Sequence, residues 1–207
     1  VKIRFGVGLG PETATQDLPR IVDRLEAAGV DSLWFSEIVY SQAVDPFIGM
    51  AFALSRTTEL KVGTSVAVLP GRQPVLVAKQ ASSLAHLSGG RLGLGVGLSP
   101  WPEDFDALGV PWERRGKRMD ECMDILKGLT TGEFFSYDGE FFQIESGFAH
   151  LLDDGASQPA REAYAELAGR GAGAGDGVAD DGGRRFGQAQ RAELSVQRGE
   201  FLLVDPA

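Results

Sequence analysis

Cysteine is almost absent from this chain, and long apolar segments are lacking altogether. The one cysteine among 207 residues, Cys122, excludes an intrachain disulfide and a cysteine-rich zinc site. No metal site is expected. No apolar run reaches the roughly 18 residues that could span a bilayer, and no apolar leader precedes the first strand-like alternation. These absences predict a cytoplasmic protein that has no membrane partner.

Basic charge is also in short supply. Lysine and arginine number 20 against 29 acidic residues, which makes the net charge −9. No basic stripe is present that could follow a phosphate backbone, so a nucleic-acid partner is not expected. The acidic excess mainly favours solubility and says little about the substrate.

Few residues have the pattern of a general acid, a general base or a nucleophile. Of the two histidines, His86 lies in a predicted helix, and a lone histidine there is more often structural or solvated than catalytic. No Ser/His/Asp arrangement is visible, so the catalytic residues stay unknown. Solvated helix faces are the favoured interpretation of an acidic cluster and a basic run: Glu103, Asp104 and Asp106; Arg114, Arg115, Lys117 and Arg118. Cys122 lies among core-spaced residues and is expected to be buried and inert.

The dinucleotide-binding fingerprint is missing too. Two glycine clusters occur, at 6–10 and 93–97, but Thr13 and Pro100 stand where the last glycine of G-x-G-x-x-G would be needed. Strand glycines can permit close packing, or they can let a flat ring lie against the backbone. We favour the ring for Gly97 and packing for Gly93 and Gly95.

Strand and helix signals alternate up to about residue 145. Strands are predicted near 3–9, 32–35, 60–69 and 91–97, and each precedes a helical pattern; Asp45-Pro46 and Pro74 open two of these helices. Residues 134–144 predict a hairpin with Asp138-Gly139 as a two-residue turn. Short connections favour parallel strands with right-handed crossovers, so the fold class is α/β. The pattern fits an open doubly wound sheet and a barrel equally.

In either fold, functional groups gather where parallel strands end. Ser36, Glu37 and Ile38 close the second predicted strand, and the segment 64–66 lies within the third. These positions are the candidates on topology alone.

The composition changes after residue 145, so we divide the chain into a region 1–145 and a tail 146–207. Lysine is absent from the tail, and the segment 169–183 is low in complexity. It offers few large side chains to offset the entropy of ordering, so residues 169–185 are predicted to lack stable structure. This composition is compatible with a flexible linker, and equally with a tail translated after the true coding frame was lost.

Five blocks in the first part of the chain resemble one family. They are AGVDSLW (28–34), VGTSVAVL (62–69), LSGGRLGLGVG (87–97), FDALGVPWERRGKR (105–118) and YDGEFF (137–142). Their order and spacing resemble the N-terminal part of the luciferase-like monooxygenase superfamily, which includes bacterial luciferase and the oxidoreductases that use the deazaflavin coenzyme F420. The resemblance implies a partial TIM (β/α)₈ barrel of about four βα units, a hairpin and an irregular tail.

The resemblance also implies where a cofactor would lie. The family holds its ring at the C-terminal ends of the strands against a non-proline cis peptide, here Ser65–Val66. In the sugar-phosphate dehydrogenase branch an Asp-His pair ends the second strand, but this chain has Glu37 and Ile38, so that proton-transfer role does not carry over. The cofactor-binding residues implied are Glu37, Ile38, Ser65, Val66, Gly97, Leu98 and Ser99.

The function implied is that of an oxidoreductase that uses FMN or coenzyme F420. It would transfer hydride to or from a small organic substrate, or oxygenate one, while the protein orients the ring and excludes water. The alternative is a truncated, non-catalytic remnant that binds flavin weakly or only associates with itself. Self-association into a homodimer is left open.

Overall fold

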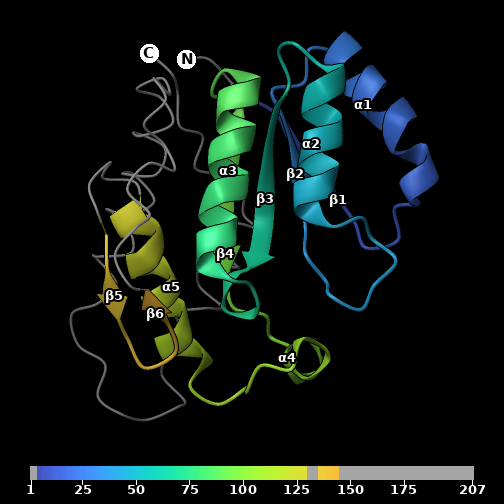
Figure 1. Cartoon of the computed structure of the whole chain (residues 1–207). Coiled ribbons are helices and arrows are strands. Elements are labelled where there is room, and N and C mark those ends of the chain that lie inside the picture. Colours follow the sequence, from blue (N-terminus) through green and yellow to red (C-terminus); the bar gives the residue numbers. More distant parts are fainter. Residues whose placement is uncertain (1–3, 130–134, 145–207) are drawn as a thin grey trace.

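The computed structural model describes residues 4–129 and 135–144, and four parallel strands form its centre (Figure 1). The strands are β1 (Gly6–Leu9), β2 (Ser32–Phe35), β3 (Lys61–Val68) and β4 (Leu92–Gly97). They lie side by side in chain order, β1-β2-β3-β4, and each neighbouring pair is parallel. The predicted four parallel strands are therefore confirmed.

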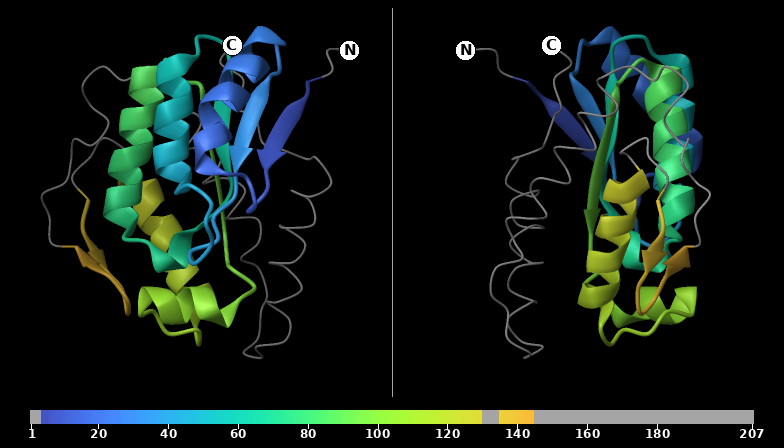
Figure 2. Two further views of the ribbon diagram at one scale, coloured as in Figure 1. Left: turned by 90° about the vertical axis from the view of Figure 1, so that its right-hand side faces the viewer. Right: turned by 60° about the vertical axis from the view of Figure 1, so that its left-hand side comes forward.

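Helices connect the strands and cover one face of the sheet (Figure 2). The α-helices are α1 (Leu18–Ala27), α2 (Pro46–Arg56), α3 (Pro74–Ser88), α4 (Pro102–Leu108) and α5 (Arg115–Leu129). Two single-turn 3₁₀ helices, η1 (Thr15–Asp17) and η2 (Leu69–Gly71), precede α1 and α3. A doubly wound sheet would carry helices on both faces. This one-sided arrangement, with strands in chain order, is part of a (β/α)₈ barrel.

Local sequence signals explain where the helices start and stop. The Asp45 carboxylate caps α2 by accepting hydrogen bonds from the backbone N–H groups of Phe47 (2.9 Å) and Ile48 (3.1 Å). Pro46 occupies the first helical position, where a missing N–H costs nothing. At the other end of the next helix, Gly89 has φ of 64°, the left-handed conformation that terminates α3.

The hydrophobic core lies between the sheet and the helices. Leu33, Phe35, Val62 and Leu94 project from the strands into a cluster that includes Met50 of α2 and further side chains of α3 and α5. Cys122 belongs to the same cluster, is fully buried, and has a pKa raised to about 12 by burial. The prediction of a buried Cys122 is confirmed, and its high pKa keeps the thiol protonated.

The hairpin forms with a longer turn than the sequence predicts. Strands β5 (Tyr137–Asp138) and β6 (Gln143–Ile144) are antiparallel, and Asp138 pairs with Gln143. Four residues, 139–142, therefore form the turn, and the two-residue Asp138-Gly139 turn is wrong. Glu121 of α5 holds this turn, because its carboxylate accepts from the backbone N–H groups at 140, 141 and 142 at 2.8–3.1 Å.

The part of the chain that the structure describes contains no helix long and apolar enough to cross a membrane. The prediction about residues 169–185 lies outside the described residues, as do His150 and the whole tail.

Candidate functional site

Parallel pairing brings the C-terminal ends of all four strands to the same end of the sheet. Leu9 at the end of β1 pairs with Phe35 at the end of β2, and Val68 at the end of β3 pairs with Gly97 at the end of β4. The predicted site residues lie in the last part of β3, at the end of β4, and in the segments that follow β2 and β4. The structure therefore brings Glu37, Ile38, the Ser65–Val66 pair and residues 97–99 to the same end of the sheet.

On the sheet face turned away from the helices, one tryptophan packs among glycines. Trp34 lies in register with Gly8 on one side, and with Gly63 and then Gly93 on the other. Its indole covers the two glycines of β3 and β4, where a Cβ would come within 2.4 Å and 3.3 Å of ring atoms. The indole N–H donates to Ser32 Oγ at 3.0 Å, so the ring points back towards the starts of the strands.

Several small residues follow on this face as the strands approach their C-terminal ends. Because side chains alternate between faces, Ser36, Gly95 and Gly97 project to the same side as Trp34. A Cβ at Gly95 would lie 2.3 Å from the Thr64 carbonyl oxygen, which confirms the packing interpretation of this glycine. At Gly97 a Cβ would lie 2.9 Å from a Val66 methyl group, so Gly97 lies directly against the third strand.

The third strand has the predicted irregularity. The Ser65–Val66 peptide bond is cis, and the register with β4 shifts between Thr64 and Ala67. Both carbonyl oxygens of the cis pair accept hydrogen bonds from the segment after β2. The Ser36 hydroxyl donates to the Ser65 oxygen at 2.9 Å, and the Glu37 N–H donates to the Val66 oxygen at 3.2 Å. The predicted cis bond is therefore confirmed, together with the contacts that hold it.

The Glu37 side chain is engaged by the protein itself. Its Oε2 accepts from the Val68 N–H at 2.6 Å, and both carboxylate oxygens accept from Arg72 Nε, at 2.9 and 3.1 Å. Arg72 also donates to Asp45 Oδ2 at 2.5 Å and stacks over the Phe47 ring at 4.8 Å. Burial alone would lower the pKa of Arg72, but its bonds to the two carboxylates outweigh this and raise it.

A second buried carboxylate joins the segments after β2 and β4. Asp104 is fully buried, accepts from the Val39 N–H at 3.1 Å, and accepts from the Ser99 hydroxyl at 2.5 Å. The Ser99 oxygen in turn accepts from the Trp101 N–H at 3.1 Å. The prediction of a solvated Asp104 is therefore wrong. Charge and spacing on a seven-residue helix do not reveal that one of three acidic side chains turns inward.

The basic run 114–118 also departs from a purely solvated face. Arg118 is half-buried, donates to the Pro70 carbonyl at 2.7 Å, and stacks over the Phe142 ring at 4.4 Å. Arg114 is exposed and forms an ion pair with Glu140 in the hairpin turn. These arginines fasten the hairpin to the barrel fragment. His86 is exposed on α3, as a solvated histidine would be.

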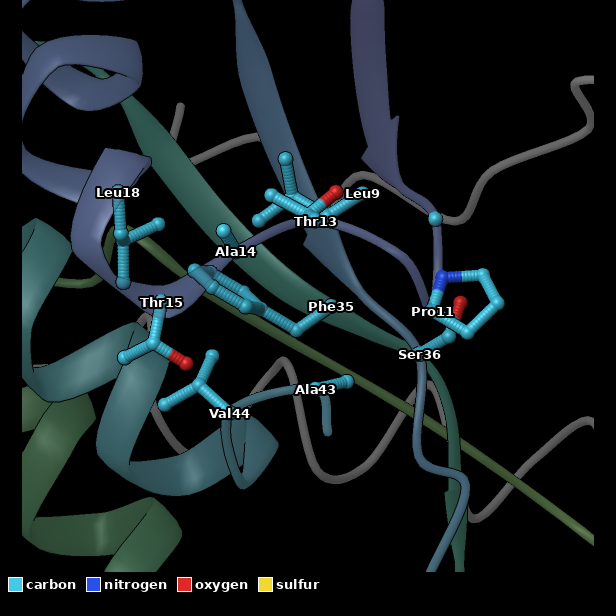
Figure 3. A pocket seen from close by; sticks show the side chains of 11 residues that line it. Leu9, Pro11, Thr13, Ala14, Thr15, Leu18, Phe35, Ser36, Ala43 and Val44 are labelled. Carbon is cyan, nitrogen blue, oxygen red and sulfur yellow. The ribbon is translucent and has the colours of Figure 1, made fainter. Parts of the chain in front are cut away.

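Two hollows open at this end of the sheet. A small one of about 20 Å³ lies between the end of β1 and the helices, and Figure 3 shows the Phe35 side chain extending into it. A larger cleft of about 430 Å³ borders Glu37, Ile38 and Arg72, together with the first turns of α2 and α3. Among the described residues, no group of three or more His, Cys, Asp or Glu side chains is placed to hold a metal ion.

Three residues that organise this end of the molecule were missed by sequence reasoning: Trp34, Arg72 and Asp104. Trp34 lies inside a strongly predicted strand, and the glycines at 8, 63 and 93 were visible as possible partners for a large ring. No local signal identifies Arg72 or Asp104, because each acts on segments 27 to 65 residues away.

Known proteins share this sequence and fold. The family model for luciferase-like monooxygenase matches residues 1–186, which extends past the boundary predicted at 145. An uncharacterized protein of Mycobacterium tuberculosis is 54% identical over 101 residues, which cover 49% of this chain and 35% of that protein. The 5,10-methylenetetrahydromethanopterin reductase of Archaeoglobus fulgidus is 30% identical over 142 residues, 69% of this chain and 42% of the reductase. The chain thus spans less than half the length of either relative.

Solved structures share the fold as well, and two of them contain or use the cofactors in question. The oxygenating constituent of 3,6-diketocamphane monooxygenase from Pseudomonas putida, in complex with FMN, superposes with a TM-score of 0.64 at 18% identity, over 70% of this chain and 44% of that one. The coenzyme F420-dependent tetrahydromethanopterin reductase of Methanopyrus kandleri superposes with a TM-score of 0.58 at 20% identity, over 72% of this chain and 46% of the reductase. Because the family model matches residues 1–186 of the 207, this chain belongs to the luciferase-like monooxygenase family.

Proposed function

We propose that the protein is an oxidoreductase that uses FMN or coenzyme F420 to transfer hydride to or from a small organic substrate, or to oxygenate one. The observation that carries this proposal is the shape of the helix-free face near the ends of β3 and β4. Gly97 against Val66, beside the Ser65–Val66 cis bond, leaves a surface of small groups on which a flat ring fits. Family membership and the FMN and F420 enzymes that share the fold support it.

The residues present fit a flat, mainly apolar ring. Trp34 fills the face below this surface, packing against Gly63 and Gly93, and its indole N–H bonds to Ser32. Ile38, Leu98 and Val66 would provide apolar contact, while Gly97 would let the ring approach the backbone. The ring, when bound, would supply the hydride chemistry.

The protein's own residues would bind the ring, orient it and exclude water. Ser36 and the Glu37 N–H hold the two carbonyl groups of the cis pair, so the wall behind the ring has a defined shape. Ser99, whose hydroxyl is engaged by Asp104 and Trp101, would shape the site through its backbone. The cleft of about 430 Å³ beside Glu37 and Ile38 has the size usual for small-molecule sites, but it lies at the first turns of α2 and α3 and does not include residues 65–66 or 97–99.

The proposal is tested by titrating the purified chain with FMN and with coenzyme F420 while following cofactor fluorescence. Saturable quenching by one cofactor is expected, and Gly97→Leu, which fills the ring surface, should abolish it. Gly8→Leu, on the same face of β1 with nothing within 4 Å of its Cβ, is the matched control. Absence of binding by either cofactor would favour the alternative of a non-catalytic remnant.

A further inference from the structure

Arg72 connects three parts of the chain at the edge of the candidate site. It follows η2, and its guanidinium contacts Glu37 just after β2 and Asp45 at the start of α2. Its side chain is 18% exposed and that of Glu37 is 10% exposed, so water competes weakly for these bonds. Asp45 is more open, at 43%, but its other oxygen caps α2. Arg72, the residue that follows η2, therefore ties together both ends of the segment 36–45.

Glu37 is saturated by this arrangement. One oxygen accepts from the Val68 N–H, both accept from Arg72 Nε, and one accepts a further bond from Arg72 Nη2. A carboxylate that exchanges protons with a substrate needs an oxygen free to face it. Both Glu37 carboxylate oxygens turn towards Val68 and Arg72, and the Glu37 backbone N–H donates to the Val66 carbonyl oxygen.

We propose that Arg72 is a positioning residue that, through Glu37 and Asp45, clamps the segment 36–45 against the cis-peptide end of β3, and that Glu37 serves this clamp instead of moving protons. The inference rests on the proposed function, because the clamped segment supplies Glu37 and Ile38 to the proposed ring site. Its physical basis is the paired, planar geometry of the guanidinium–carboxylate contact, which restricts orientation as well as distance.

The clamp predicts that Glu37→Gln and Arg72→Gln both loosen the segment 36–45. Arg72→Gln should have the larger effect, because it also removes the contact with Asp45, and the double variant should add nothing to Arg72→Gln. A proton-transfer role for Glu37 predicts a loss in Glu37→Gln that Arg72→Gln does not share. The matched control is Arg56→Gln, because Arg56 makes an equivalent two-pronged contact with Asp23 (2.7–3.0 Å) between α2 and α1.

Amide hydrogen exchange of the full chain, without cofactor, measures the clamp directly. Exchange across 36–45 should accelerate roughly tenfold in Arg72→Gln and in the double variant, less in Glu37→Gln, and stay unchanged in Arg56→Gln. If Arg72→Gln fails to fold, Arg72→Lys, which keeps the charge but loses the paired geometry, takes its place. Unchanged protection of 36–45 in the Arg72 variant would overturn the clamp.

The second measurement is the visible circular dichroism of FMN or coenzyme F420 bound at saturation. A shift shared by the Arg72 and Glu37 variants, with Arg56→Gln matching the wild type, is expected, because a general loss of stability does not reorient a bound ring. A spectrum altered by Glu37→Gln alone would contradict the positioning role. If the wild type binds neither cofactor, the proposed function fails, and the exchange measurement alone decides the clamp.

Discussion

Gly8 and Gly63 flank Trp34 at the same level of the sheet, yet their surroundings differ. A Cβ at Gly63 would lie 2.4 Å from the indole and 2.9 Å from the Gly93 carbonyl oxygen, whereas a Cβ at Gly8 would meet nothing within 4 Å. We therefore expect Gly63→Ala to lower the free energy of unfolding by about 2 kcal/mol, since neither a packed ring nor a backbone can move cheaply.

Urea denaturation of Gly63→Ala and Gly8→Ala measures this difference. Gly8→Ala should lie within about 0.5 kcal/mol of the wild type, as substitutions away from tight contacts usually do. Equal losses in the two variants would show that intrinsic strand preferences, and not the Trp34 contact, decide the cost.

Asp104 provides a second test at the residue scale. Removing its carboxylate leaves the Val39 N–H and the Ser99 hydroxyl without their buried acceptor. Asp104→Ala should therefore cost about 2–3 kcal/mol of unfolding free energy. Asp106→Ala on the exposed side of the same helix is the control and should cost little. If both variants unfold at the same urea concentration, the buried carboxylate contributes no stability.

At the scale of elements, Glu26 joins the end of α1 to the turn before β3. Its carboxylate accepts from the backbone N–H groups of Thr58, Glu59 and Leu60 at 2.7–3.0 Å. Burial by itself would raise the pKa of Glu26, but these hydrogen bonds outweigh it and lower the pKa from 4.5 to about 2. The stabilisation is thus fully present above pH 4.5 and is lost as the pH falls towards 2.

Replacing Glu26 by Gln should therefore destabilise the protein by about 1–2 kcal/mol at pH 7, a range reduced for partial exposure. The difference from the wild type should shrink between pH 4.5 and pH 2, where the wild type becomes protonated. Denaturation midpoints across this pH range measure the effect, with Glu59→Gln, an exposed neighbour, as control. A difference that stays constant with pH would show that the Glu26 charge is not responsible.

For the whole molecule, the described sheet has two edges. Among the described strands, β1 pairs only with β2 and β4 only with β3, and Phe5, 70% exposed, stands next to β1. Open strand edges beside exposed apolar side chains favour association. We expect the chain to associate with itself as its concentration rises, and Phe5→Lys to weaken this association.

Light scattering after size-exclusion chromatography, over a series of concentrations, provides the measurement. Leu87→Lys is the matched control, because Leu87 is 83% exposed but lies at the end of α3, away from the strand edges. A monomer at every concentration, or equal effects of the two lysine variants, would refute the role of this edge.

The alternation of strands and helices, the caps at Asp45 and Gly89, and the buried character of Cys122 could all be predicted from the sequence, because local propensity and hydrophobic spacing determine them. The site residues at 37–38, 65–66 and 97–99 could be predicted only in part. Topology places strand ends together, and the family resemblance identified the cis bond at Ser65–Val66.

Tertiary structure alone decided the rest, because the deciding contacts join residues far apart in the chain. In the described part of the chain, the placement of α1, α2 and α3 on one face of the sheet selected a barrel fragment over an open sheet. Glu121 of α5 bonds to the backbone of the hairpin turn, and Asp104 turns inward to accept from Val39. Arg72 engaged Glu37, 35 residues away, which determines what that carboxylate can do. Packing determines which distant residue a side chain contacts, and the local sequence pattern does not predict that residue.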